Sequence, residues 1–128
     1  MNYNELTRHY FESTGNVGEL KGPGVFRGAA GNRAQGTWVQ FDLQIKAGVV
    51  AAAKFLTFGC PHTIAASAWL AEQAVGRQLT ALLPENVQTL RERFAVPVEK
   101  LGRLLIVEDA WLAAALPAID SRACGPTS

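Results

Sequence analysis

The chain has 128 residues, 48% of them hydrophobic, and its 12 basic and 11 acidic side chains give a formal net charge of +1. A chain of this length forms one compact domain and needs no disulfide bonds for stability. The basic residues are scattered, and no apolar run approaches the roughly 20 residues of a membrane span. These features argue against nucleic-acid binding and against a membrane protein, and without a signal-peptide pattern we expect a cytoplasmic location.

The middle of the chain carries the pattern of a β-hairpin. Residues 38–46 alternate strictly between apolar and polar side chains, which is typical of a half-buried antiparallel strand. Ala47 and Gly48 then form a tight turn into a second strand that returns to Phe58. The glycine-bounded segment Gly24–Gly31 is predicted as a third strand of the same sheet. The apolar face of the first strand holds Val39, Phe41, Leu43 and Ile45, and the polar face holds Gln40, Asp42, Gln44 and Lys46.

Helical spacing of apolar residues predicts four helices in the rest of the sequence. They cover residues 2–12, 61–76, 84–93 and 100–118, with Pro61 at a first helical position, where its missing N–H costs nothing. The stretch "AVPVEK" between the last two is predicted as a loop. Together these elements predict an α+β fold, with a three-stranded antiparallel sheet and helices packed on one face.

The domain is predicted to span residues 1–120, followed by a short flexible tail at 121–128. This tail contains Cys124, the second of two cysteines. A disulfide between Cys124 and Cys60 is not favoured in a cytoplasmic protein.

Cys60 lies where the last strand ends and a helix begins, followed by Pro61 and His62. The N–H groups of the first helical turn and the helix dipole favour negative charge at such a position, which lowers the pKa of a thiol. A second interpretation stays open on position alone. Cys60 is then a small buried apolar residue, and His62 is a surface residue of the first turn.

Four stretches in this order resemble the U-type iron–sulfur cluster assembly scaffolds, the family of IscU and the NifU N-terminal domain. They are the "GNVG" of residues 15–18, the "LQIK" of residues 43–46, the "FGC" of residues 58–60 followed by "IAAS", and the "EDA" of residues 108–110. The resemblance extends from Tyr3 to about Ile119. It implies a small antiparallel sheet with packed helices, the same fold that the periodicity predicts.

The resemblance also implies a ligand set of three cysteines and an aspartate that holds a nascent cluster or a zinc ion. Only the central cysteine is present here, as Cys60. The first cysteine of the family falls on Thr37 and the aspartate on Val39. The third cysteine falls on Arg103, and the histidine that often precedes it falls on Gly102.

These replacements argue against an ordinary metal site. Clusters and zinc need thiolate or imidazole ligands, which threonine and valine do not supply. Arg103 would bring a fixed positive charge and a bulky guanidinium into the ligand cavity. Two routes to cluster binding remain: a homodimer that pairs Cys60 and His62 of both copies around a two-iron cluster, or completion by an external thiol or a partner protein.

A further stretch of the family, a Leu-Pro-Pro-Val-Lys loop recognised by a chaperone, corresponds to Val96–Lys100. One proline is replaced by Val98 and the valine before the lysine by Glu99, so we do not expect chaperone recognition. The simpler interpretation is a loop that caps the last helix.

Three hypotheses of function follow. The first is a divergent, non-enzymatic scaffold homologue in iron–sulfur cluster assembly, which binds a cysteine desulfurase or other assembly proteins and keeps Cys60 as its only ligand or sulfur acceptor. It would carry a cluster, an iron or zinc ion, or none. The second is a regulatory binding module on the same fold without cluster chemistry. The third is a thiol enzyme or persulfide carrier that uses Cys60 as nucleophile.

Overall fold

The computed structural model describes residues 4–13, 15–80, 83 and 86–124. Its sheet has three strands in the order β1-β2-β3, with both neighbouring pairs antiparallel. The strands are β1 (Val25–Asn32), β2 (Thr37–Lys46) and β3 (Val49–Phe58). All three predicted strands and the predicted hairpin are therefore confirmed.

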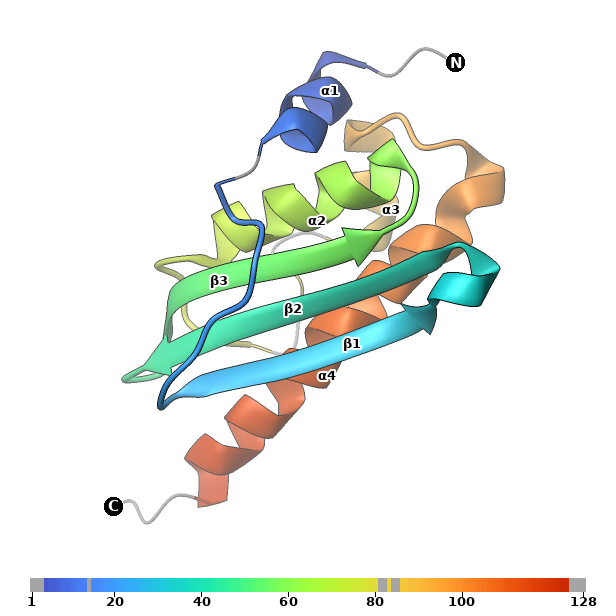
Figure 1. The fold of residues 1–128 in the computed structure, drawn as a ribbon. Coiled ribbons are helices and arrows are strands. Elements are labelled where there is room, and N and C mark those ends of the chain that lie inside the picture. Colours follow the sequence, from blue (N-terminus) through green and yellow to red (C-terminus); the bar gives the residue numbers. More distant parts are fainter. Residues whose placement is uncertain (1–3, 14, 81–82, 84–85, 125–128) are drawn as a thin grey trace.

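The described helices gather on one face of this sheet (Figure 1), as the sequence predicted. They are α1 (Glu5–Glu12), α2 (Pro61–Ala74), α3 (Val87–Arg93) and α4 (Leu101–Cys124), with short 3-10 turns η1 (Arg33–Gln35) and η2 (Val98–Lys100). No helix in the described ranges is long and apolar enough to cross a membrane.

Two helices begin later than predicted because an asparagine caps each of them. The side chain of Asn4 accepts a hydrogen bond from the N–H of Thr7, and that of Asn86 from the N–H of Thr89, each at 2.8 Å. Such a side chain satisfies an N–H of the first turn and fixes the helix start. Residues 84 and 85, predicted as part of α3, lie outside the described residues.

Helix α4 ends later than predicted. It continues through Pro117 to Cys124 instead of stopping at 118, so its backbone extends into the segment that the sequence assigned to a tail. Residues 125–128 of that segment lie outside the described residues.

The position of α4 against β1 depends on Gly28. A Cβ atom built on Gly28 would lie 2.1 Å from the backbone nitrogen of Ala114, so only glycine allows this approach. Further in, the rings of Phe41 on β2 and Trp111 on α4 meet edge to face, with centroids 5.6 Å apart. Helix α4 thus covers β1 and β2, while α2 packs against β3 and carries α1 on its other side.

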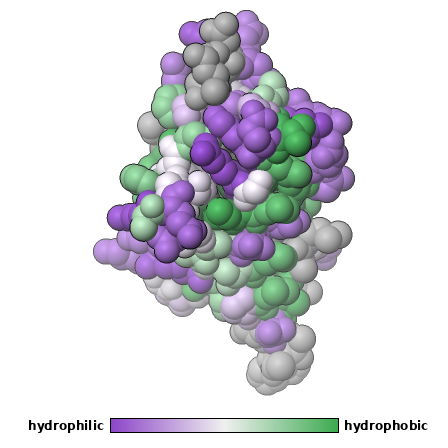
Figure 2. Space-filling view, turned by 90° about the vertical axis from the view of Figure 1, so that its right-hand side faces the viewer, coloured by the Kyte–Doolittle hydropathy of each residue, from purple (hydrophilic) through white to green (hydrophobic). Residues whose placement is uncertain are grey.

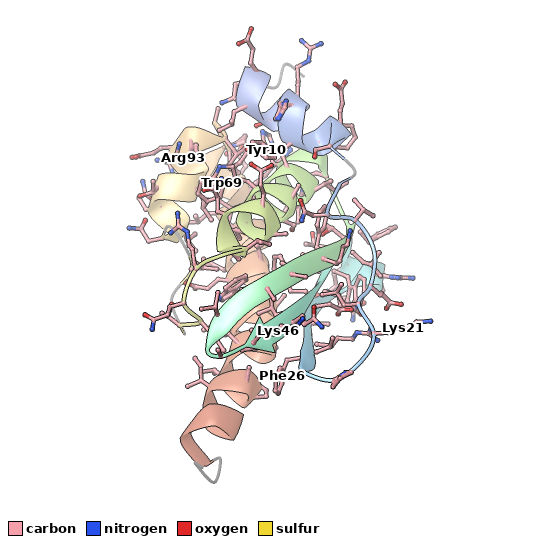
Figure 3. All side chains as sticks on the ribbon, turned by 90° about the vertical axis from the view of Figure 1, so that its left-hand side faces the viewer. Tyr10, Lys21, Phe26, Lys46, Trp69 and Arg93 are labelled. Carbon is pink, nitrogen blue, oxygen red and sulfur yellow. The ribbon has the colours of Figure 1, made fainter. Side chains whose placement is uncertain are left out.

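A second aromatic cluster joins α1, α2 and the end of α3. Phe94 lies edge to face with both Tyr10 and Trp69, with ring centroids 6.3 Å apart in each pair. The guanidinium of Arg93 lies over the Trp69 ring at 5.2 Å from its centroid, and Figure 3 shows the two side chains together. The contact of Tyr10 with this cluster docks α1 onto the rest of the molecule.

Part of the polar face of β2, at Gln40 and Asp42, is buried where the sequence predicted an exposed face. Asp42 is 0% exposed and accepts two hydrogen bonds from Arg27, at 2.8 and 2.9 Å, and one from the N–H of Leu20 at 2.8 Å. Gln40 is 8% exposed and donates to Glu19. The segment before β1 crosses this face (Figure 1). The alternation therefore assigns the side chains to the correct faces of β2, but it does not reveal that this segment covers Gln40 and Asp42.

We predict that Gly28→Ala lowers the free energy of unfolding by at least about 2 kcal/mol, because the added methyl group meets backbone atoms of α4 that cannot move aside. Denaturant unfolding of the purified protein measures this change. Gly102→Ala is the matched control, since a Cβ at Gly102 meets nothing within 4 Å and alanine favours the helix. Equal stability of the two variants would contradict this account of the contact between α4 and β1.

Candidate functional site

Cys60 occupies the N-cap position of α2, directly after β3. Its carbonyl oxygen accepts the first helical hydrogen bond, from the N–H of Ile64 at 3.1 Å, and Pro61 stands at the first helical position, as predicted. The residue is half-buried, and its Sγ lies 3.4 Å from Oγ1 of Thr63. The thiol is therefore neither a plug in the core nor a freely exposed side chain.

The surroundings of Cys60 favour the thiolate. Partial burial alone would raise the pKa of the thiol, but hydrogen bonds from the side chain and backbone of Thr63, the side chain of Arg103 and the backbone of His62 outweigh it, so the pKa is lowered. Backbone N–H groups at the start of a helix and a nearby cation are the usual causes of such a shift.

Arg103 reaches Cys60 from the first turn of α4. Its guanidinium lies near enough to Cys60 to help lower the pKa of the thiol. One turn further along α4, Ile106 lies close to Gly31 at the end of β1, which holds the start of this helix against the same end of the sheet. The structure therefore brings Arg103, which the sequence analysis assigned to a family ligand position, close to Cys60.

Thr37 and Val39 lie on the face of β2 that the helices cover, and their exposed fractions are 4% and 0%. Trp38 pairs with Phe58 across the strands, so Thr37 stands one position beyond that pair, at the level of Gly59. A Cβ atom on Gly59 would lie 3.6 Å from the carbonyl oxygen of Gly36. The start of β2 and the start of α2 therefore meet at one end of the sheet.

His62 is buried, with an exposed fraction of 3%, so the interpretation of it as a surface residue is wrong. The second residue of α2 turns into the protein, towards the side on which Lys100 and Arg103 lie. Burial lowers the pKa of the imidazole, and the positive charges of Lys100 and Arg103 lower it further. The neutral imidazole is consequently favoured at neutral pH.

Trp38 takes no part in the surroundings of Cys60, although it is adjacent to Thr37 in the sequence. Successive side chains of a strand point to opposite faces, so Trp38 lies on the face away from the helices. There the guanidinium of Arg33 lies over its ring at 4.8 Å from the centroid.

The stretch Val96–Lys100 leads directly into α4. Val96 is buried at 2% exposure, Pro97 caps the turn η2, and Val98 is 68% exposed. Figure 2 faces the end of the molecule at which η1 lies and α4 begins, where hydrophobic and hydrophilic surfaces alternate over short distances. The absence of chaperone recognition stays a prediction.

The residues near Cys60 do not form a conventional metal centre. Among the described residues, no group of three or more His, Cys, Asp and Glu side chains is placed to hold a metal ion. The neighbours of the thiol offer a hydroxyl group and a guanidinium, and a guanidinium repels a cation. The donor set therefore does not fit a zinc ion or a cluster held by this chain alone.

Two contributors to this site were missed by the sequence analysis. Thr63 stands three residues after the N-cap, at the position from which a side chain reaches back to the cap. This spacing could have identified Thr63 as a neighbour of Cys60 from the sequence. Lys100 precedes α4, and its positive charge acts on His62. This effect depends on how α4 packs on α2, so no local sequence pattern could have predicted it.

The chain belongs to the NifU-like N-terminal domain family, whose model matches residues 2–121. Its relatives include the iron–sulfur cluster assembly scaffold protein IscU of Azotobacter vinelandii, 31% identical over 117 residues, which cover 89% of this chain and 91% of that protein. The IscU scaffold protein of Haemophilus influenzae is also 31% identical, over 89% of this chain and 93% of that protein. These relatives are named as scaffold proteins and not as catalysts.

Solved structures confirm the fold. The NifU-like N-terminal protein of Brucella abortus superposes with a TM-score of 0.69 at 18% identity, over 93% of this chain and 94% of that one. A putative scaffold protein for the SUF system from Fervidobacterium islandicum gives a TM-score of 0.68 at 15% identity, over 89% and 94% of the two chains. The predicted α+β class and the resemblance to U-type scaffolds are both confirmed.

We predict that Cys60 reacts with iodoacetamide at a lower pH than an ordinary cysteine does, because the alkylating thiolate is stabilised by its neighbours. In Arg103→Gln the midpoint of the pH–rate profile rises and the reaction slows several-fold below that midpoint. Mass spectrometry of the peptide that contains Cys60 separates its reaction from that of Cys124.

Arg8→Gln is the matched control for this measurement. Arg8 is an exposed arginine of α1 whose removal changes the net charge equally. If both variants shift the pH–rate profile by the same amount, the effect comes from overall charge, and the proximity of Arg103 to Cys60 does not control the reactivity of the thiol.

Proposed function

We propose that this chain acts in iron–sulfur cluster assembly as a divergent scaffold-like protein that accepts sulfur on Cys60 and does not hold a complete cluster with its own side chains. The observation that carries the proposal is the place of Cys60, half-buried at the N-cap of α2 with its Sγ 3.4 Å from Oγ1 of Thr63 and with Arg103 nearby. In place of a third thiolate ligand, the site has a cation that stabilises a single thiolate.

The chemistry of this site suits transfer of sulfur from a persulfide. The Cys60 thiolate attacks the terminal sulfur of a persulfide on a cysteine desulfurase, a new S–S bond forms on Cys60, and the donor cysteine leaves as a thiolate. The step is a thiol exchange that needs no added oxidant or reductant. A lowered thiol pKa increases the fraction of attacking thiolate at neutral pH, and the partial exposure of Cys60 leaves it open to a partner.

Burial of His62 argues against a cluster shared between two copies of the chain. A dimer that uses Cys60 and His62 of both copies would need the imidazole at the surface, whereas its exposed fraction is 3%. Arg103 and Lys100 would also place positive charge beside the shared iron. We therefore propose that any cluster or metal ion is completed by a partner protein or an external thiol.

We predict that incubation with a cysteine desulfurase and cysteine adds one sulfur atom to Cys60, observed by mass spectrometry of the intact protein and of its peptides. Cys60→Ser takes up no sulfur at this position, while Arg103→Gln takes it up more slowly than the wild type at neutral pH. Arg8→Gln, with the same loss of charge, behaves like the wild type. A Cys60 peptide that stays unmodified in the wild type would overturn the proposal.

We also predict that anaerobic incubation with iron and sulfide leaves the wild type colourless and poor in iron. The variant Thr37→Cys with Arg103→Cys restores two thiolates beside Cys60 and gains visible absorption and bound iron, and a further Cys60→Ser change removes both. The double variant leaves the buried Val39 unchanged, so it avoids placing a carboxylate in the core. A wild type that binds as much iron as the double variant would contradict the proposed loss of the ligand set.

A further inference from the structure

The outer face of the sheet, on the side away from the helices, ends in an exposed aromatic pair. Trp38 of β2 and Phe58 of β3 stand directly opposite each other, so their side chains share this face, and Phe58 is 50% exposed. On its other side Trp38 is paired with Gly31 of β1, which has no side chain to cover the indole. The two aromatic side chains therefore form a small apolar patch at one corner of the sheet.

The segment before β1 covers the neighbouring part of this face but stops short of the patch. Glu19 accepts a hydrogen bond from Gln40, and the N–H of Leu20 donates to Asp42. These two residues of β2 are buried beneath the segment, at 8% and 0% exposure. Trp38 lies two residues before Gln40 on the same strand, about 7 Å away, where the partly exposed indole marks the end of this cover.

Arg33 adds a positive charge to the patch. Its guanidinium lies over the Trp38 ring at 4.8 Å from the centroid, and it forms no ion pair with another described residue. A guanidinium that stacks on a ring keeps its N–H groups in its own plane, where they can bind a carboxylate. Aromatic residues and arginine are enriched at protein–protein interfaces and carry much of the binding energy there. Arg33, Trp38 and Phe58, which we call the aromatic corner, thus have the composition of a protein-binding surface.

The aromatic corner borders Cys60, at the end of the molecule that Figure 2 faces. Phe58 precedes Cys60 by two residues, so their Cα atoms lie at most about 7 Å apart. A protein that hands over a sulfur atom must bring it within about 3.5 Å of the Cys60 Sγ. A specific interface covers roughly 800 Å² of each partner, which equals a disc of about 16 Å radius. A donor protein seated over Cys60 therefore reaches the aromatic corner.

We propose that the aromatic corner is the docking surface for the protein that delivers sulfur to Cys60. This inference rests on the proposed function, because it states where the persulfide donor of that function, a cysteine desulfurase, binds. The donor places an apolar side chain against Trp38 and Phe58 and a carboxylate on the guanidinium of Arg33. The corner holds the donor protein and takes no part in the reaction of the thiol.

The test compares two sulfur donors. One is a cysteine desulfurase supplied with cysteine, and the other is glutathione persulfide, which is small enough to reach Cys60 without docking. Mass spectrometry of the Cys60 peptide gives the loading rates. We expect Phe58→Ser to raise the KM of the desulfurase for this protein about tenfold and Arg33→Gln to raise it about fivefold, with kcat unchanged in both. Glutathione persulfide loads both variants at the wild-type rate.

Phe11→Ser and Arg8→Gln are the matched controls, since Phe11 is 43% exposed and both residues lie on α1. They behave like the wild type with either donor. The docking surface is overturned if Phe58→Ser and Phe11→Ser have the same KM, or if the wild type takes sulfur from glutathione persulfide alone. It is also overturned if gel filtration shows a dimer that Phe58→Ser dissociates, because a second copy then occupies the corner. A wild type that takes sulfur from neither donor overturns the proposed function itself, and this inference with it.

Discussion

The close approach of α4 to β1 at Gly28 sets the position of Arg103 beside Cys60, on which the proposed sulfur chemistry depends. The contact between Gly28 and the backbone at Ala114 leaves no room for a side chain, so α4 lies closer to β1 than any residue other than glycine would allow. This one helix carries Arg103 at its start, beside Cys60, and Trp111 in its middle, beside a cavity of about 250 Å³ that Arg77 also lines. A small displacement of α4 would separate Arg103 from the thiol and change the shape of this cavity together.

The surroundings of Cys60 are built from three elements and favour an anion. Thr37, Cys60 and Arg103 come from β2, α2 and α4, and the fold brings the starts of these elements to one end of the sheet. Arg103 lies at a helix start and is only partly buried, so its guanidinium fits at this end of the sheet. A guanidinium stabilises an anion, which suits a thiolate or persulfide better than iron.

The local sequence patterns predicted the helices and strands well. The packing of these elements explains where the predictions were wrong. Strict alternation identified β2, and Pro61 after Cys60 identified the start of α2. The same alternation gave Asp42 an exposed position, but the segment before β1 covers it and Arg27 of β1 is its partner. His62 was interpreted as a surface residue for a similar reason, since its burial comes from α4 and η2, which lie far away in the sequence.

The sequence by itself determined the three strands, the helix start at Cys60 and the family resemblance, because each of these depends on local periodicity or on residue type at a fixed spacing. Only the tertiary structure decided that Arg103 lies near Cys60, that Gln40 and Asp42 on the polar face of β2 are buried, and that Trp111 and Arg77 line one cavity. These are contacts between residues that lie far apart in the chain, and they exist only once α4 is packed against the sheet at Gly28.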